Sequence, residues 1–300
     1  MPQRFNHYNH QYERRMPREN RAGFRRTPLS VLLKLLLYIA LIALAAFTLI
    51  PFAWMLSASL KLDREVFSFP IRWIPETFHW ENYRLIWEKV PLLTYFKNTA
   101  VIAILVTFIQ TLTSSFAAYA FAKLRFPGRN VLFICYVATI AVPWQTYMLP
   151  QFILMRSMGL YDTLWAIVVL QSFSAFGVFL MRQFYQGIPS ELCEAARIDG
   201  LSEYGIWARI MLPLSRAAIA TLVIFTFVGT WNDYLGPMIY LTRDVNKTVQ
   251  VGLKRFIQEN SSDYHLIMAV SVCSLVPVSV VFLSLQKYFI QGIATTGLKG

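Results

Sequence analysis

The sequence EAARIDGLSEYGIWARIMLP, from Glu194 to Pro213, decides the fold of this chain. It lies between two long apolar segments. From average residue usage, its seven identities arise together at this spacing about 10⁻⁸ times per start position. The spacing therefore indicates a defined element rather than an ordinary amphipathic loop. The seven fixed residues are Glu194, Ala195, Ala196, Gly200, Ile210, Leu212 and Pro213.

Local signals in the loop 189–213 predict two short helices joined by a glycine. Ser190 follows a proline and is the expected N-cap of the first helix. Gly200 permits the left-handed conformation that ends a helix, and Ser202 is the expected N-cap of a second helix, which Pro213 limits. Because neither helix is long enough to be stable alone, the loop needs a groove to sit in. One side of the first helix is expected to be nearly flat and open to another backbone; it carries Leu192, Ala195, Ala196 and Asp199.

The composition is that of a membrane protein. Hydrophobic residues make up 56% of the chain and charged residues only 15%, whereas soluble domains carry about 25% charged residues. Six apolar stretches of 19 to 26 residues are each long enough to cross the hydrocarbon layer as a helix. The sequence predicts an all-α polytopic domain over residues 31–300, with spans near 35–60, 98–122, 130–155, 163–181, 217–242 and 266–286.

The placement of positive charge predicts the orientation. With both termini in the cytoplasm, 17 Lys and Arg residues face inward and 11 face outward, which is the bias expected of a cell-membrane protein in that orientation. Residues 1–30 are polar and Arg-rich without apolar periodicity, so we expect a disordered basic tail. The net charge of +12 is divided between two faces. We therefore expect the positive charge to set the membrane topology and to attract anionic lipid, and we expect no nucleic-acid partner.

No enzymatic site is expected in this chain. Its three cysteines, Cys135, Cys193 and Cys273, are not extracytoplasmic in the predicted topology, so we expect no disulfide. No His lies near them at ligand spacing, and no metal site is expected. The phosphate-binding motif G-x-x-x-x-G-K-[ST] is absent, so the chain is expected to bind no nucleotide or other cofactor and to carry no catalytic residue.

Asp233 is the only carboxylate inside an expected span. Intramembrane carboxylates face a bundle interior or an aqueous path, because they are costly in lipid. Pro237 removes the helical partner of the Asp233 carbonyl, so we expect a kink there. Two interpretations stay open for Trp231, Asn232 and Asp233. They either line a translocation path, where Trp stacks on a sugar and the polar groups bind hydroxyls, or form an inter-helix hydrogen-bond cluster at the kink.

The segment between the first two spans contains Trp73, Trp80 and Trp87. Trp80, Tyr83 and Trp87 follow helical spacing, which predicts a short interfacial helix with its aromatic residues on one face. These aromatics either form a membrane-interface belt or provide a contact surface for a solute-binding protein.

The Glu194–Pro213 stretch resembles the EAA loop of membrane subunits of binding-protein-dependent ABC importers. Three further motifs resemble the carbohydrate-importing branch, the MalG-type permeases: F-x-K-L-R-F-P-G-R at Phe121–Arg129, W-N-D at Trp231–Asp233, and the tail Gly292–Gly300. The resemblance covers roughly Leu35–Gly300. The tail departs from it, because Thr296-Gly297 stand where the family usually has Gly-Ala.

The resemblance implies a type I ABC importer permease that moves a sugar or oligosaccharide; a glycerol phosphate or another non-sugar solute fits the same class. The loop 189–213 would insert into a cleft of the ATPase, with Glu194 as a charged anchor or as a brace to the neighbouring loop. The implied partners are a second permease subunit, two ATPase subunits that use the ATP, an extracytoplasmic binding protein and membrane lipid. A stand-alone secondary transporter would show repeated spans or several buried charges, and a membrane enzyme would show clustered catalytic groups. The sequence favours neither.

Overall fold

The computed structural model describes residues 28–257 and 263–297, and every regular element in these ranges is a helix. The all-α prediction is therefore confirmed. The chain divides into two compact units, Met1–Ala53 and Trp54–Gly300. The predicted disordered tail, residues 1–30, lies outside the described residues except for its last three, which begin a helix. The last three residues of the C-terminal motif, 298–300, lie outside them as well.

Helix α2 (Pro28–Ala58) corresponds to the first expected span. It has 31 residues, so its length is roughly 46 Å, which exceeds the thickness of the hydrocarbon layer. Its last turn, from Trp54 onward, belongs to the second unit, where Ala58 is fully buried.

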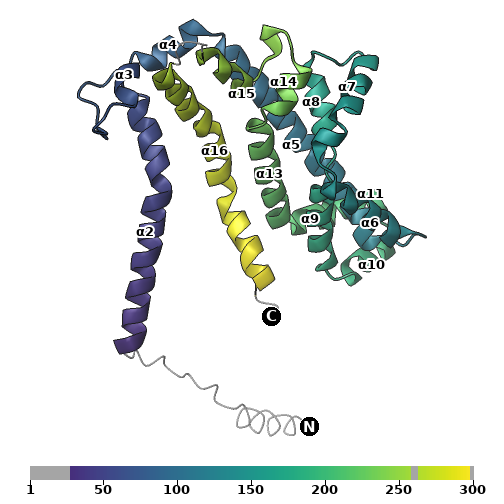
Figure 1. The fold of residues 1–300 in the computed structure, drawn as a ribbon. Coiled ribbons are helices and arrows are strands. Elements are labelled where there is room, and N and C mark those ends of the chain that lie inside the picture. The colour runs from purple at the N-terminus through teal and green to yellow at the C-terminus, as the bar shows by residue number, and fades with distance from the viewer. Residues whose placement is uncertain (1–27, 258–262, 298–300) are drawn as a thin grey trace. The chain divides into compact units, whose positions relative to one another are not determined.

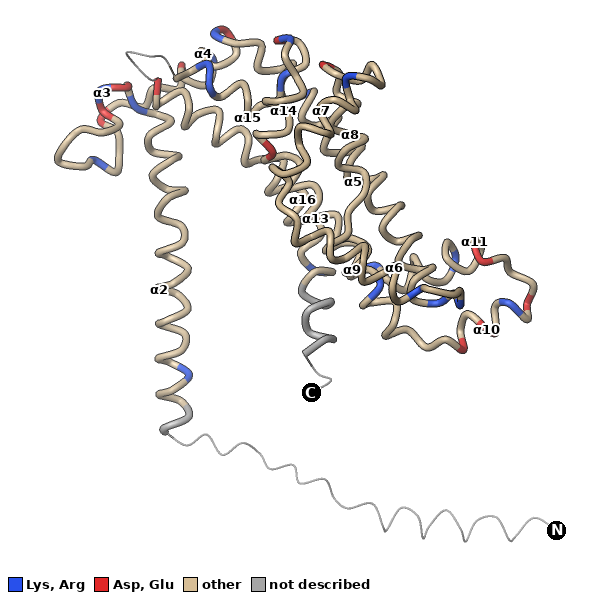
Figure 2. Tube along the Cα trace, turned by 45° about the vertical axis from the view of Figure 1, so that its right-hand side comes forward, with Lys and Arg blue, Asp and Glu red and all other residues tan. Residues whose placement is uncertain are grey.

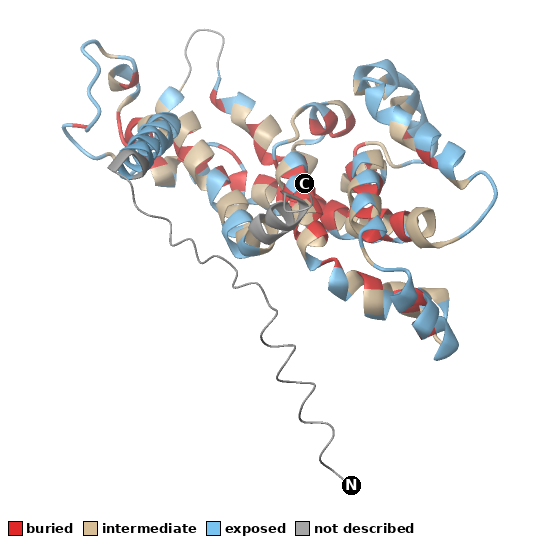
Figure 3. Ribbon diagram, turned by 90° about the horizontal axis from the view of Figure 1, so that it is seen from below, coloured by how far each residue is buried: buried red, intermediate tan, exposed pale blue. Residues whose placement is uncertain are grey.

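Four helices form the centre of the second unit: α5 (Leu92–Lys123), α9 (Ala175–Gln186), α13 (Arg216–Trp231) and α16 (Tyr264–Gly297). Helix α5 packs against α9 and α13, and α13 packs against α16 (Figure 1). Gly177 allows α9 to approach α5 closely, because a Cβ at this position would lie 2.4 Å from Ser114 Oγ. Small residues have this role in membrane bundles, where tight van der Waals packing drives helix association. Buried residues gather where the helices meet (Figure 3).

Shorter helices lie at the two ends of these long helices (Figure 1). One end, here called the α4 end, carries α3 (Asp63–Val66), α4 (Asn82–Lys89), α7 (Met148–Ser157), α14 (Leu235–Tyr240) and α15 (Val249–Gly252). The opposite end, the α10 end, carries α6 (Arg129–Ala138), α10 (Glu191–Ile198), α11 (Glu203–Ile206) and α12 (Leu212–Leu214). Helix α8 (Leu164–Gln171) precedes α9. Charged residues gather at the same two ends (Figure 2), as expected where the helices leave the hydrocarbon layer.

The structure confirms several membrane-spanning helices but not six continuous ones. Within the described ranges, four helices are long and apolar enough to cross a membrane, or five if the bent pair Glu203–Leu214 and Arg216–Trp231 counts as one span. The fourth expected span consists of α8 and α9, separated by a short break at residues 172–174.

The third expected span, 130–155, is divided into short pieces. Helix α6 runs into a 3-10 turn at Thr139–Ala141, a second turn follows at Trp144–Thr146, and α7 begins only at Met148. Pro143 lies at the break. A proline disfavours helical backbone in the residue before it, and Val142 is extended, with φ −85° and ψ 115°. Hydropathy alone did not predict this break.

The predicted short helix between the first two spans is present as α4. It starts at Asn82, so Trp80 precedes it in a turn, whereas Tyr83 and Trp87 lie on it. The Tyr83 hydroxyl lies 2.8 Å from Ser59 Oγ, and the Trp87 ring contacts the ring of Phe96 in α5 in a tilted arrangement, with the centroids 5.8 Å apart. These aromatics therefore join α4 to the bundle, while Trp80 remains 67% exposed.

Candidate coupling segment and intramembrane cavity

The loop predicted to couple this chain to an ATPase forms two short helices around Gly200. Helix α10 ends at Ile198, and Gly200 adopts the left-handed conformation with φ +83°. The amide of Leu201 donates to the carbonyl of Ala196 at 2.9 Å, which satisfies an end carbonyl of the helix. The predicted glycine elbow is confirmed. We call residues 189–213 the coupling segment.

The two predicted N-caps have different outcomes. The Ser202 hydroxyl accepts from the Gly205 amide at 3.2 Å, so the cap of α11 is confirmed. Ser190 makes no side-chain cap, and that prediction was wrong. Its backbone is already helical, with φ −72° and ψ −22°, and its carbonyl accepts the Cys193 and Glu194 amides. Its hydroxyl instead lies 3.4 Å from Lys123 Nζ at the end of α5.

The face of α10 that was expected to meet a partner is only partly free. Ala196 is buried together with Cys193, and both pack in the cluster that contains Ala118 of α5 and Val178 of α9. Ala196 therefore seats α10 on this chain's own helices. Five exposed residues of this helix and its C-cap form a surface that we call the α10 face: Leu192, Glu194, Ala195, Ile198 and Asp199. Ile198 is 87% exposed and lies beside the exposed Leu192, so this face is partly apolar.

An ion pair joins the two arms of the elbow. Arg197 Nε donates to Glu203 Oε1 at 2.6 Å, and the guanidinium makes a second bond to Oε2 at 3.3 Å. The hydrogen bond from Arg197 lowers the pKa of the Glu203 carboxyl. The Tyr119 hydroxyl of α5 donates to the same carboxylate. This hydrogen bond joins the elbow to α5. Sequence reasoning missed this brace, although an Arg and a Glu flanking a glycine elbow were a visible signal.

The last three fixed residues of the motif lie where the coupling segment turns into the membrane. Ile210 is half-buried and packs in the same cluster as Ala196, Leu212 is half-buried, and Pro213 is exposed. Trp207–Met211 form one π-helical stretch before α12. The chain then bends by 82° into α13. Structurally, these residues shape the bend rather than the α10 face.

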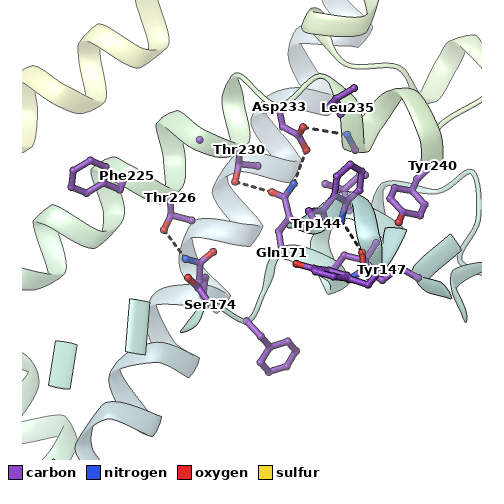
Figure 4. A pocket seen from close by; sticks show the side chains of 17 residues that line it. Trp144, Tyr147, Gln171, Ser174, Phe225, Thr226, Thr230, Asp233, Leu235 and Tyr240 are labelled. Carbon is purple, nitrogen blue, oxygen red and sulfur yellow. Dashed lines mark hydrogen bonds between the residues drawn. The ribbon is translucent and has the colours of Figure 1, made fainter. Parts of the chain in front are cut away.

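A cavity of about 490 Å³ opens between the central helices and α14 (Figure 4). Helices α5, α8, α13 and α14 contribute to its wall, as does the broken segment around Trp144. Its polar side chains are amides, hydroxyls and one carboxylate, and its apolar surface is largely aromatic. The residues used below are Gln110, Trp144, Tyr147, Gln151, Gln171, Ser174, Phe225, Thr226, Thr230 and Asp233.

A hydrogen-bonded chain of side chains fixes one wall of this cavity (Figure 4). Gln171 Nε2 donates to Asp233 Oδ2 at 2.7 Å, and Thr230 Oγ1 donates to Gln171 Oε1 at 3.0 Å. Asp233 Oδ1 accepts from the Gly236 amide at 3.2 Å, at the start of α14. The helix breaks at residues 232–234, so the kink predicted from Pro237 is confirmed. Asp233 thus lines the cavity and also accepts a hydrogen bond from the backbone at the start of the next helix.

The other two residues of the W-N-D motif lie outside the cavity wall. Trp231 is only 2% exposed, and its Nε1 donates to the carbonyl and hydroxyl of Ser274 in α16, both at 3.1 Å. Asn232 is exposed and its amide donates to the Val228 carbonyl at 3.0 Å. Asp233 lines the cavity and also bonds Gln171 of a neighbouring helix at the kink, so its position agrees with both interpretations left open, whereas Trp231 makes only the inter-helix contact.

Asp162 joins two loops at the α4 end and was not singled out from the sequence. Its carboxylate accepts from the backbone amides of Thr242 and Arg243 at 2.8 and 3.0 Å, from Arg243 Nε at 2.5 Å and from Asn246. Its backbone is left-handed, with φ +58°. Burial raises the pKa of the Asp162 carboxyl, but these hydrogen bonds outweigh it and lower the pKa to about 2.

The sequence matches a family model over residues 110–295, which include both the coupling segment and every cavity residue used above. The model describes the binding-protein-dependent transport system inner membrane component. The chain belongs to this family. It is therefore a multi-pass permease subunit of an ABC transporter, a transport protein and not an enzyme.

Relatives and a solved structure match most of the chain. The arabinooligosaccharide transport permease AraQ of Halalkalibacterium halodurans is 33% identical, over 90% of this chain and 98% of the relative. The sn-glycerol-3-phosphate transport permease UgpE of Salmonella choleraesuis is 32% identical, over 77% and 85%. A bacterial ABC transporter that imports the acidic polysaccharide alginate matches in structure with a TM-score of 0.77 and 25% identity, over 88% of this chain and 98% of that one.

Proposed function

We propose that this permease moves a sugar or oligosaccharide through a path that includes the intramembrane cavity. An extracytoplasmic binding protein delivers the solute, a second permease subunit completes the path, and two ATPase subunits hydrolyse ATP. The cavity carries the proposal. Amides and hydroxyls both donate and accept hydrogen bonds, as sugar hydroxyls do, and the aromatic rings of Trp144, Tyr147 and Phe225 supply flat apolar surface for sugar rings.

The α10 face supports the proposed contact with the ATPase. It presents the exposed Ile198 and Leu192 beside Glu194, whereas the opposite face of the helix packs on this chain's own helices through Cys193 and Ala196. A groove on the ATPase would cover this apolar surface, and Glu194 would meet its rim. Ile210, Leu212 and Pro213 would then pass movement of the elbow through the bend into α13.

We also propose that both termini are cytoplasmic. Helix α16 ends near the α10 end of the bundle (Figure 1), so the end of this helix lies on the same side as the coupling segment. Helix α2 ends at the α4 end with Ala58 buried there, and its 31 residues are enough to bring its start across the membrane. The bias of Lys and Arg supports the same orientation.

Uptake by the importer reconstituted in liposomes tests the role of the cavity. Gln171→Leu removes the hydrogen bonds that hold Asp233 and Thr230 in the wall and deletes an amide that lines the cavity, so uptake should fall clearly. The matched control is Gln183→Leu, because Gln183 is exposed on α9 and lies outside the cavity wall. Unchanged uptake in Gln171→Leu, with the complex intact, would exclude the cavity from the path.

ATP hydrolysis tests the coupling segment separately. Glu194→Lys reverses an exposed charge on the α10 face and should abolish the stimulation of ATPase activity by solute-loaded binding protein. Glu88→Lys reverses an exposed charge at the α4 end and serves as the control for hydrolysis. Full stimulation in Glu194→Lys would place the ATPase contact elsewhere.

A further inference from the structure

We propose that the cavity accepts neutral polyhydroxylated solutes and rejects anionic ones, and that Asp233 sets this selectivity. The inference rests on the proposed function, because it takes the cavity to hold the imported solute. It adds the charge class of that solute. Relatives of this chain carry names that refer to arabinooligosaccharides and to sn-glycerol-3-phosphate, and a related structure imports an acidic polysaccharide. The family therefore leaves the charge of the solute open.

The wall of the cavity carries one acidic residue without a basic partner. Figure 4 draws 17 lining residues, and in the described part of the chain this lining contains Asp233 but no Lys, Arg or His. Sites that bind carboxylates or phosphates in proteins rely on Arg, Lys or clustered backbone amides. The donors here are the amides of Gln110, Gln151 and Gln171 and a few hydroxyls, which suit neutral solutes.

The carboxylate cannot easily turn away from the cavity. Gln171 Nε2 and the Gly236 amide hold its two oxygens at 2.7 and 3.2 Å. The backbone also fits closely around it, since a Cβ at Gly236 would lie 2.6 Å from Asp233 Oδ2. Thr230 in turn fixes the Gln171 amide in the orientation that points its nitrogen at the carboxylate. The acidic group is therefore a permanent part of the wall.

The cavity is small enough for the charge of Asp233 to act on a solute bound in it. A volume of 490 Å³ corresponds to a sphere about 10 Å across. A uronate or phosphate bound against this wall then lies on the order of 7 to 10 Å from Asp233. At an effective dielectric constant of about 20, repulsion between two unit charges 7 to 10 Å apart weakens binding roughly 15- to 50-fold. A neutral solute escapes this penalty and a cationic one gains from it.

Direct binding to the purified importer in nanodiscs tests the proposal without selection by the binding protein. The probes are maltotriose, trigalacturonate and the fully deacetylated trimer of glucosamine, which are neutral, anionic and cationic. Quenching of tryptophan fluorescence reports binding, and the signal that disappears in Trp144→Phe is assigned to the cavity. We expect trigalacturonate to bind at least about tenfold more weakly than maltotriose, and the cationic trimer at least as tightly as maltotriose.

Asp233→Asn keeps the shape of the side chain and removes its charge, so it should bring trigalacturonate and maltotriose within about threefold of each other. The matched control Glu88→Gln removes a charge at the α4 end, outside the cavity wall, and should leave the difference unchanged. Equal binding of the three probes by the wild type would overturn the selectivity while leaving the cavity as a solute site. A difference that persists in Asp233→Asn would overturn the role of Asp233. Binding of no probe would overturn both the inference and the proposed cavity.

Discussion

Replacing Gly200 isolates the contribution of the left-handed elbow to coupling. A Cβ added at Gly200 would meet no atom within 4 Å, so a substitution there costs only backbone energy. A left-handed conformation costs an L-residue about 1–2 kcal/mol, and Val is among the residues that adopt it least readily. If the ATPase binds only the elbow seen here, Gly200→Val should weaken ATPase binding roughly 5- to 30-fold. Gly200→Asn should have a smaller effect, because Asn tolerates this conformation.

Gly205→Ala is the matched control in the same coupling segment. Its Cβ would lie 3.5 Å from Ser202 Oγ, an ordinary contact, and Gly205 does not have a positive φ. The assay titrates purified ATPase subunits onto the permease pair in nanodiscs and measures their dissociation constant, with solute-stimulated hydrolysis as a second readout. Membrane insertion should be the same for all variants. If Gly200→Val binds the ATPase as tightly as Gly205→Ala, the elbow conformation is not what the ATPase recognises.

Three further predictions concern side-chain contacts that the structure shows. The pKa of Asp162 is lowered in the folded protein to about 2, so the stability that its carboxylate contributes is complete above the unfolded value of about 3.9 and is lost as pH falls from about 4 to 2. The melting temperature of the purified importer should show this loss in the wild type but not in Asp162→Asn. A double-mutant cycle of Arg197→Gln and Glu203→Gln should give a coupling free energy of about 0.5 kcal/mol in ATPase binding, because both side chains are more than one third exposed. If the effects of the two single variants on ATPase binding simply add, the ion pair does not support the elbow. Trp231→Phe should lower stability by about 1 kcal/mol through loss of the bond to Ser274, while the KM for uptake stays unchanged; a raised KM would return Trp231 to the solute path.

Several local features of the coupling segment and the helix breaks could be predicted from the sequence, because they depend on the chemistry of neighbouring residues. Gly200 has the left-handed backbone that its type allows at low cost, and Ser202 caps the helix that follows it. Pro237 breaks the fifth expected span beside Asp233 through its missing amide. The same local argument failed at Ser190, since its own backbone is helical and its hydroxyl does not bond the first amides of the helix.

The directions of side chains could not be predicted, since they depend on which helices become neighbours. A span that is apolar on every side gives no signal for the face that meets protein, because lipid and protein interior are similarly apolar. Ala196 therefore proved to face this chain's own core and Trp231 to face α16, although both belong to recognisable motifs.

The cavity and the Asp162 clamp depend on residues that are distant in the sequence. Gln171 and Asp233 are 62 positions apart, and Asp162 and Arg243 are 81 apart. The sequence determined the helical membrane fold, the coupling elbow and the family, because composition, periodicity and short motifs act over a few residues. Only the tertiary structure decided which polar groups meet inside the membrane, because packing of the helices brings them within hydrogen-bonding distance.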